Sequence, residues 1–156
     1  SRLVVAGDGP LLDELRGQAA SLDLGDQVEF VGHVGGEQKA ALLRQADVHV
    51  VPSIVSSTGD VEGLPVSLLE GLAWGKVCIA TPQGGADEIL ETGRDGFLVP
   101  GADVEALAAR LVEAFALAPG PRAAMQGAAR RKAQEFEWSV VARRQLELLR
   151  AAARQE

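Results

Sequence analysis

The segment VEGLPVSLLEGLAWGKVCIA, from Val61 to Ala80, contains the clearest local structural signals in the chain. It predicts a helix over residues 65–74, because Pro65 suits a first helical position: its φ is fixed and it lacks the N–H that would stay unpaired there. Gly75 follows where a left-handed residue ends a helix. The apolar run Val77–Ala80 then predicts a strand. The segment therefore predicts a helix that leads directly into a buried strand.

Short apolar runs of this kind recur along the chain and alternate with amphipathic stretches. They predict strands at Leu3–Ala6, Val28–Val31, Val48–Val51, Val77–Ala80 and Gly96–Val99. The stretches between and after them predict helices at Pro10–Leu22, Glu37–Gln45, Pro65–Trp74, Ala86–Leu90, Asp103–Phe115, Pro121–Glu135 and Ser139–Ala153. Runs without polar alternation are typical of strands covered on both faces. We therefore expect one α/β domain over residues 1–156, a three-layered, doubly wound (Rossmann-like) parallel sheet, with the last helices (121–153) packed outside it.

Composition excludes several classes of function. The chain has 156 residues, 47% of them hydrophobic, and a net charge of −7 with no basic run, which argues against a nucleic-acid surface. Cys78 is the only cysteine and lies in the apolar run VCIAT, so we expect a core residue. A catalytic thiol is the less favoured alternative, because the sequence places no histidine partner. One cysteine cannot form an internal disulfide, which fits a cytoplasmic protein. No apolar run approaches the ~20 residues that span a bilayer.

Four loops directly follow predicted strands and are the candidates for ligand contact. They are GDGP, GHVGGEQK, PSIVSSTGDVEGLP and TPQGG. In open α/β sheets, ligands bind at the carboxyl ends of the strands. We therefore expect these loops to lie along one edge of the sheet.

Two glutamates, Glu62 and Glu70, flank the start of the helix predicted after Pro65. The N–H groups of Val66, Ser67 and Leu68 would have no partner within that helix, which makes its start a potential anion site. Glu70 lies about one turn inside and could lean back toward the same end, while Glu62 could reach ligand hydroxyls from the loop. Both carboxylates could instead only stabilise the helix dipole, an effect of about 0.3–1 kcal/mol. The residues alone leave both interpretations open.

The run from Ala46 to Pro100 resembles the donor-binding half of family 4 glycosyltransferases, which have the GT-B fold. The resemblance rests on ADV and PS, the glutamate–seven residues–glutamate motif, the GG-x-x-E loop (Gly84, Gly85, Glu88) and the G-x-L-V-P strand. The flanking segments AGDGP and VEFVGHV fall in the family's order, so the resemblance covers nearly the whole chain. The longer loop SSTGDVEGLP is similar to the polysaccharide-building branch of the family.

The resemblance implies a role for each matched position. Glu62 would contact hydroxyls of the donor sugar and is the candidate catalytic-site residue, and Glu70 would hold the ribose of the nucleotide. His33 and Val34 would frame the nucleobase, and Lys39 would be a basic position on the nucleotide side. The sugar and diphosphate would be cradled by the backbone of five consecutive residues, Gly63, Leu64, Pro65, Val66 and Ser67. The alternatives are an exposed loop residue for His33 and a solvated helix charge for Lys39.

The implied activity is retaining transfer of a sugar from a nucleotide-sugar donor, a UDP- or GDP-sugar, in polysaccharide or glycoconjugate biosynthesis. This chain would supply donor binding as the C-terminal domain. No D-x-D motif is present, so we expect no metal and no other cofactor. We expect a cytoplasmic protein, or one peripheral at the inner face of the membrane, with any membrane contact made by a further domain.

The chain also departs from the family pattern. Family members have an earlier strand and helix, which carry an Arg and a Lys that bind the diphosphate, and an N-terminal acceptor domain. We expect the first strand of the sheet to come from other residues or a partner, and these 156 residues to be inactive alone. A non-catalytic module with the same fold is the alternative. Dinucleotide-dependent oxidoreduction is a weak alternative hypothesis, because GDGP lacks the full G-x-G-x-x-G spacing.

Overall fold

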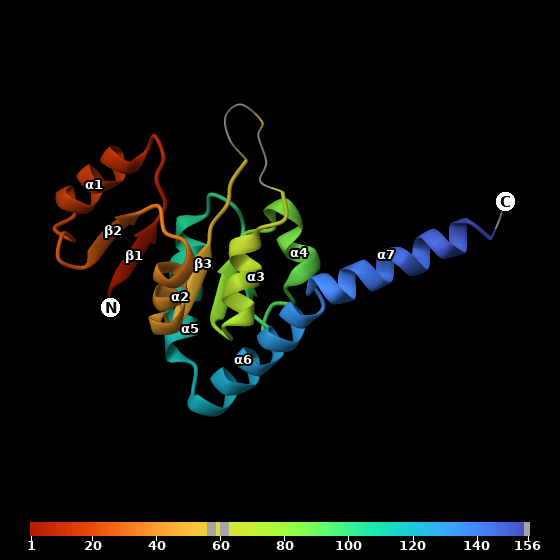
Figure 1. Ribbon diagram of the computed structural model, residues 1–156. Helices are drawn as coiled ribbons and strands as arrows, with labels where there is room; N and C mark the ends of the chain where they lie inside the picture. Colours follow the sequence, from red (N-terminus) through yellow and green to blue (C-terminus); the bar gives the residue numbers. More distant parts are fainter. Residues whose placement is uncertain (56–58, 60–62, 155–156) are drawn as a thin grey trace. The chain divides into compact units, whose positions relative to one another are not determined.

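The computed structural model describes residues 1–55, 59 and 63–154 (Figure 1). Its backbone forms two compact units, an N-terminal unit (Ser1–Arg44) and a C-terminal unit (Gln45–Glu156). Each unit is described by itself below. Glu62 lies outside the described residues.

The N-terminal unit is built on a strand–helix–strand motif. Strand β1 (Leu3–Ala6) pairs in parallel with β2 (Val28–Gly32), with Leu3 opposite Val28. Helix α1 (Leu12–Ser21) connects them, and α2 (Gly36–Gln45) follows β2 up to the boundary of the unit. Helix α1 has no buried residue, and three of the four residues of β1 are exposed. This unit therefore has little interior of its own.

The C-terminal unit contains a three-stranded parallel sheet in the order β3-β4-β5. Its strands are β3 (Val48–Val51), β4 (Val77–Ala80) and β5 (Phe97–Leu98). Its helices are α3 (Val66–Ala73), the 3₁₀ turn η1 (Gln83–Gly85), α4 (Ala86–Ile89), α5 (Val104–Ala116), α6 (Pro119–Gln134) and α7 (Trp138–Ala152). Helix α7 has no buried residue.

Strand β4 is the centre of this unit, and all four of its residues are buried. Because side chains alternate along a strand, its residues divide between two faces. Cys78 and Ala80 pack in one apolar cluster with Leu68 and Leu72 of α3. Val77 and Ile79 belong to a second cluster, which contains Phe97, Val99, Ala114 and Met125. Helices thus cover both faces of the sheet, which gives the three layers that the apolar run predicted.

Helix α3 begins and ends close to the expected residues. Pro65 is the residue before the helix, with an extended ψ of 91°, and not its first helical residue as the sequence predicted. The end forms a Schellman motif: Gly75, at φ 63°, donates to Leu72 O over 2.8 Å, and Lys76 donates to Gly71 O over 3.0 Å. Helix α6 lies alongside α3 (Figure 1). Helix α3 therefore packs against both α6 and β4.

The α/β prediction with parallel strands is confirmed, and the strand predictions hold within one or two residues at each end. In the part of the chain that the structure describes, the strands form two separate sheets rather than one. There, β1 pairs only with β2, and β3 pairs only with β4. The prediction of one domain over residues 1–156 stays a prediction. No described helix is both long enough and apolar enough to cross a membrane.

Candidate functional site

The first turn of α3 offers backbone donors. Leu68 N–H donates to Pro65 O over 2.9 Å, so the prediction that it lacks a partner was wrong: a tight first turn uses it. Within the described part of the chain, the N–H groups of Val66 and Ser67 have no backbone acceptor. These two groups stand at the positive end of the helix dipole, where an anion is stabilised.

The predicted contact residues before and in this turn differ in exposure. Pro65 is fully buried, so it offers a ligand almost no accessible surface. Leu64 is 50% exposed and Val66 61%, and Gly63 and Ser67 are exposed as well. The start of α3 therefore presents two amides, a hydroxyl and two apolar side chains to the outside.

Glu70 lies one turn further along α3 and is half-buried. Its charge raises the pKa of His49, although burial is the larger influence and lowers that pKa overall. Glu70 therefore stands close to the start of α3, on the side that faces β3. Glu62, the proposed sugar contact, cannot be placed, since it lies outside the described residues.

His49 of β3 contacts the same turn, although no sequence motif singles it out. Its Nε2 lies 3.0 Å from Ser67 O and 3.1 Å from Ser67 Oγ. The ring lies against Gly71: a Cβ there would clash with His49 Cδ2 and stand 3.0 Å from Cys78 Sγ. The spacing of His49 and Gly71 is not a recognisable motif, which explains why sequence analysis missed the pair.

A hydrogen bond also joins the loop after β3 to the loop after β4. Thr81, which is buried, donates its hydroxyl to Ser53 O over 2.5 Å. In the GG-x-x-E loop, Gly84 and Gly85 adopt φ of 65° and 79°, a conformation that favours glycine. Glu88 is exposed on α4. The two strand-end loops of this unit are therefore anchored to the sheet.

The remaining predicted site residues belong to the N-terminal unit. His33 is exposed in the bend after β2, and Val34 beside it is half-buried. Lys39 is half-buried in the first turns of α2, and its N–H donates to Gly35 O over 3.3 Å. The roles of His33 and Val34 in framing a nucleobase, and of Lys39 on the nucleotide side, stay predictions.

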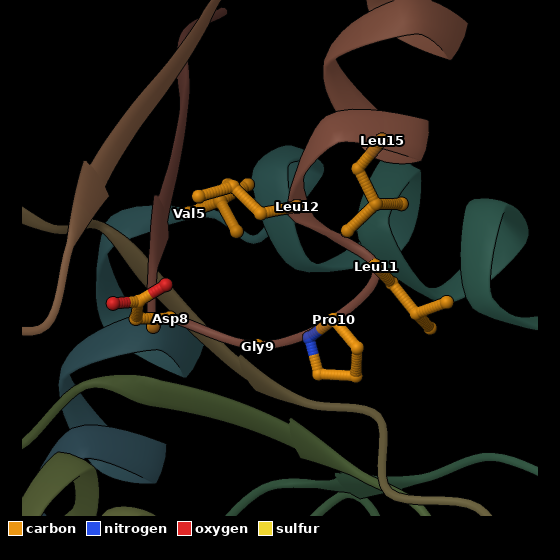
Figure 2. A pocket seen from close by; sticks show the side chains of 8 residues that line it. Val5, Asp8, Gly9, Pro10, Leu11, Leu12 and Leu15 are labelled. Carbon is orange, nitrogen blue, oxygen red and sulfur yellow. The ribbon is translucent and has the colours of Figure 1, made fainter.

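A pocket of about 320 Å³ adjoins the turn from β1 to α1 in the N-terminal unit. Figure 2 shows the side chains that line it: Val5, Leu11, Leu12 and Leu15 are apolar, and Asp8 is the one charged group. A carboxylate beside apolar walls repels a diphosphate. The pocket therefore does not have the chemistry of the anion site predicted at α3.

The described residues give little support to thiol catalysis or to a metal site. Burial raises the pKa of the Cys78 thiol to about 12, so this cysteine stays protonated and fits the core interpretation. Among the described residues, no three His, Cys, Asp or Glu side chains gather as metal ligands would.

Comparison with known proteins identifies the family. The family model of the glycosyl transferases group 1 matches residues 1–132, and the chain therefore belongs to this family. It is 35% identical over 151 residues to WcaL of Escherichia coli, a candidate colanic acid biosynthesis glycosyltransferase, covering 96% of this chain and 37% of that protein. It is 34% identical over 151 residues to a GDP-mannose-dependent phosphatidylinositol monomannoside mannosyltransferase of Mycobacterium tuberculosis, covering 95% of this chain and 39% of the relative.

The fold matches solved glycosyltransferase structures. The HepE protein of Anabaena, crystallised with UDP and glucose, superposes with a TM-score of 0.80 at 23% identity, covering 96% of this chain and 40% of that one. The chain thus spans about two fifths of the length of the proteins it matches. The GT-B type of fold expected from the sequence is confirmed, and the family is confirmed as the glycosyl transferases group 1, whereas membership of family 4 stays a prediction.

Proposed function

We propose that this chain is the C-terminal, donor-binding part of a retaining family 4 glycosyltransferase that uses a UDP- or GDP-sugar. The start of α3 carries the proposal. Val66 and Ser67 offer N–H groups at the positive end of a helix dipole, and Glu70 stands one turn behind them. A diphosphate at the amides and a ribose at the carboxylate would use both features.

The similar proteins support this assignment. Relatives are named for colanic acid biosynthesis and for GDP-mannose-dependent mannosyl transfer, and a protein with the same fold was crystallised with UDP and glucose. We therefore propose sugar transfer in polysaccharide or glycolipid biosynthesis. Acceptor binding would fall to other parts of the complete protein.

Each predicted residue keeps its proposed role. Glu62 would contact the donor sugar, Glu70 the ribose, and the backbone from Gly63 to Ser67 the sugar and diphosphate. His33, Val34 and Lys39 would face the nucleotide. The glutamates act as binding groups in this scheme, because a retaining transfer of this type needs no glycosidase-like pair of acid and nucleophile.

Kinetics of the complete protein test the proposal. Glu70→Ala should weaken nucleotide binding roughly tenfold or more, because a hydrogen bond to a charged group is lost. Glu62→Ala should mainly lower the rate of transfer. Glu105→Ala is the matched control, since Glu105 lies in the first turn of α5 and is exposed. If Glu70→Ala and Glu62→Ala kept wild-type kinetics and lost only thermal stability, the dipole-stabilising interpretation would replace the proposal.

The rival function is a non-catalytic binding or assembly module with the same fold. Such a module would bind a nucleotide sugar without transferring it in the complete protein. Measuring binding and transfer on the same sample separates the two functions.

A further inference from the structure

The side chain of His49 makes a contact that the proposed function does not yet use. Its Nε2 lies within hydrogen-bond distance of two oxygens of one residue, Ser67 O at 3.0 Å and Ser67 Oγ at 3.1 Å. A carbonyl oxygen can only accept, so Nε2 must carry the hydrogen. The ring N–H is therefore shared between the carbonyl and the hydroxyl of Ser67.

This sharing determines what the Ser67 hydroxyl can do. Its oxygen already accepts a hydrogen bond from the ring, so its own hydrogen is directed to another acceptor. Ser67 is exposed, and its N–H is one of the two amides at the start of α3 that lack a described backbone acceptor. The amide and the hydroxyl of one residue can thus both donate at the same helix end.

The ring is held in place by packing. It lies against Gly71 of α3, where a Cβ would clash with it, and its residue stands opposite Cys78 in the β3–β4 ladder. Burial lowers the pKa of His49, which favours the neutral ring with a single N–H. The ring therefore meets α3 at both Ser67 and Gly71.

We propose that His49 is a positioning residue for donor binding, which fixes Ser67 so that its hydroxyl as well as its amide donates to a phosphate oxygen of the nucleotide sugar. The proposal rests on the proposed function, since it gives His49 a role in binding the same donor at the start of α3. The ligand chemistry it requires is an anionic diphosphate oxygen next to the first turn of α3.

Two variants of His49 separate the effect of its hydrogen bond on donor binding from the effect of its packing. His49→Phe keeps a ring against Gly71 but removes the N–H, so we expect the KM for the donor to rise roughly tenfold with little change in kcat. His49→Gln restores an N–H donor at a similar distance from the backbone, so it should stay within about threefold of wild type. Ser139→Ala is the control, because Ser139 is an exposed serine at the equivalent second position of α7.

A double-mutant cycle tests whether His49 acts through Ser67. Ser67→Ala should raise the KM as His49→Phe does, and the double variant should be no worse than either single variant. Additive effects, or an equal loss in His49→Phe and His49→Gln, would overturn the proposal. Loss of thermal stability in His49→Phe with an unchanged donor KM would reduce His49 to a structural residue and also overturn it.

A measurement that needs no substrate tests the role of His49 independently of the proposed function. Nitrogen-15 NMR of the complete wild-type protein should show the His49 ring protonated at Nε2, whether or not a nucleotide sugar is present. A ring protonated at Nδ1 overturns the positioning role alone. Failure of the wild-type protein to bind any UDP- or GDP-sugar, with the ring protonated at Nε2, overturns the proposed function and with it the purpose assigned to His49.

Discussion

Strands β1 and β4 are both four-residue runs of hydrophobic residues, LVVA and VCIA, yet they lie in very different surroundings. In the N-terminal unit, three of the four residues of β1 are exposed and α1 has no buried residue. In the C-terminal unit, every residue of β4 is buried between two apolar clusters. An apolar run therefore predicts a strand, while the neighbouring elements determine how deeply that strand is buried.

The largest difference expected between the two units is in thiol reactivity. A pKa of about 12 for Cys78, against about 9.0 for an exposed thiol, leaves about a thousandfold less thiolate at pH 8. A cysteine introduced into β1 by Ala6→Cys should react readily with a thiol reagent, because Ala6 is exposed. We expect Cys78 to react only when the C-terminal unit unfolds. Equal rates for the two cysteines would show that β4 is not a buried core strand.

The second largest difference is expected in the free energy of unfolding when a leucine of each unit is shortened to alanine. Leu72 is 0% exposed and Leu3 is 53% exposed. Leu72→Ala should lower the free energy of unfolding by about 2–5 kcal/mol, because it leaves a cavity between α3 and β4. Leu3→Ala should cost about 1 kcal/mol or less, since its side chain is already half in water. Urea denaturation measures both, and similar losses would contradict the contrast between the units.

Helix glycines should give effects of opposite sign. Gly71 in α3 has no room for a Cβ beside His49, whereas Gly17 in α1 has nothing within 4 Å. Gly71→Ala should destabilise the protein by about 1–3 kcal/mol through overpacking. Gly17→Ala should stabilise it by about 0.5–1 kcal/mol, because alanine favours the helix. Thermal unfolding tests the pair, and a stabilising Gly71→Ala would mean that the His49 ring does not lie against α3.

The smallest effect concerns pH. Burial holds the pKa of His49 below its ordinary value of about 6.5, against the opposing influences of the hydrogen bond to Ser67 and of the charge of Glu70. The unfolded chain then binds a proton at a higher pH than the folded one, so the free energy of unfolding should fall as the pH drops below about 6.5. In His49→Phe, the free energy of unfolding should decrease less over the same pH range, because the titrating ring is absent. An identical pH profile for wild type and His49→Phe in denaturant titrations would contradict the buried neutral ring.

Local signals predicted much of the C-terminal unit. Gly75 ends α3 in the left-handed conformation, as the sequence indicated. The helix predicted from Asp103 forms as α5, and Asp103 caps it by accepting a hydrogen bond from Ala106 N over 2.9 Å. These features depend on residues a few positions apart. Pro65 was placed one position too far into the helix, because both positions suit its fixed φ.

What the sequence could not provide depends on distant contacts. The exposure of β1 follows from which elements pack together, and LVVA carries no sign of it. The contact between His49 and Ser67 joins residues 18 positions apart through the pairing of β3 with β4 and the packing of α3 on both. Of the candidate site, the glutamates were found through their motif, and the histidine that contacts Ser67 only through the structure.

The most direct test of the central claim follows the backbone amides of Val66 and Ser67 by NMR in the complete protein, during titration with UDP- and GDP-sugars. If the start of α3 binds the donor diphosphate, these two amides should show the largest shifts among the residues of the C-terminal unit, and Glu70→Ala should weaken the titration roughly tenfold or more. Shifts confined to other regions, such as the pocket beside α1, with Val66 and Ser67 unchanged at saturation, would contradict the account.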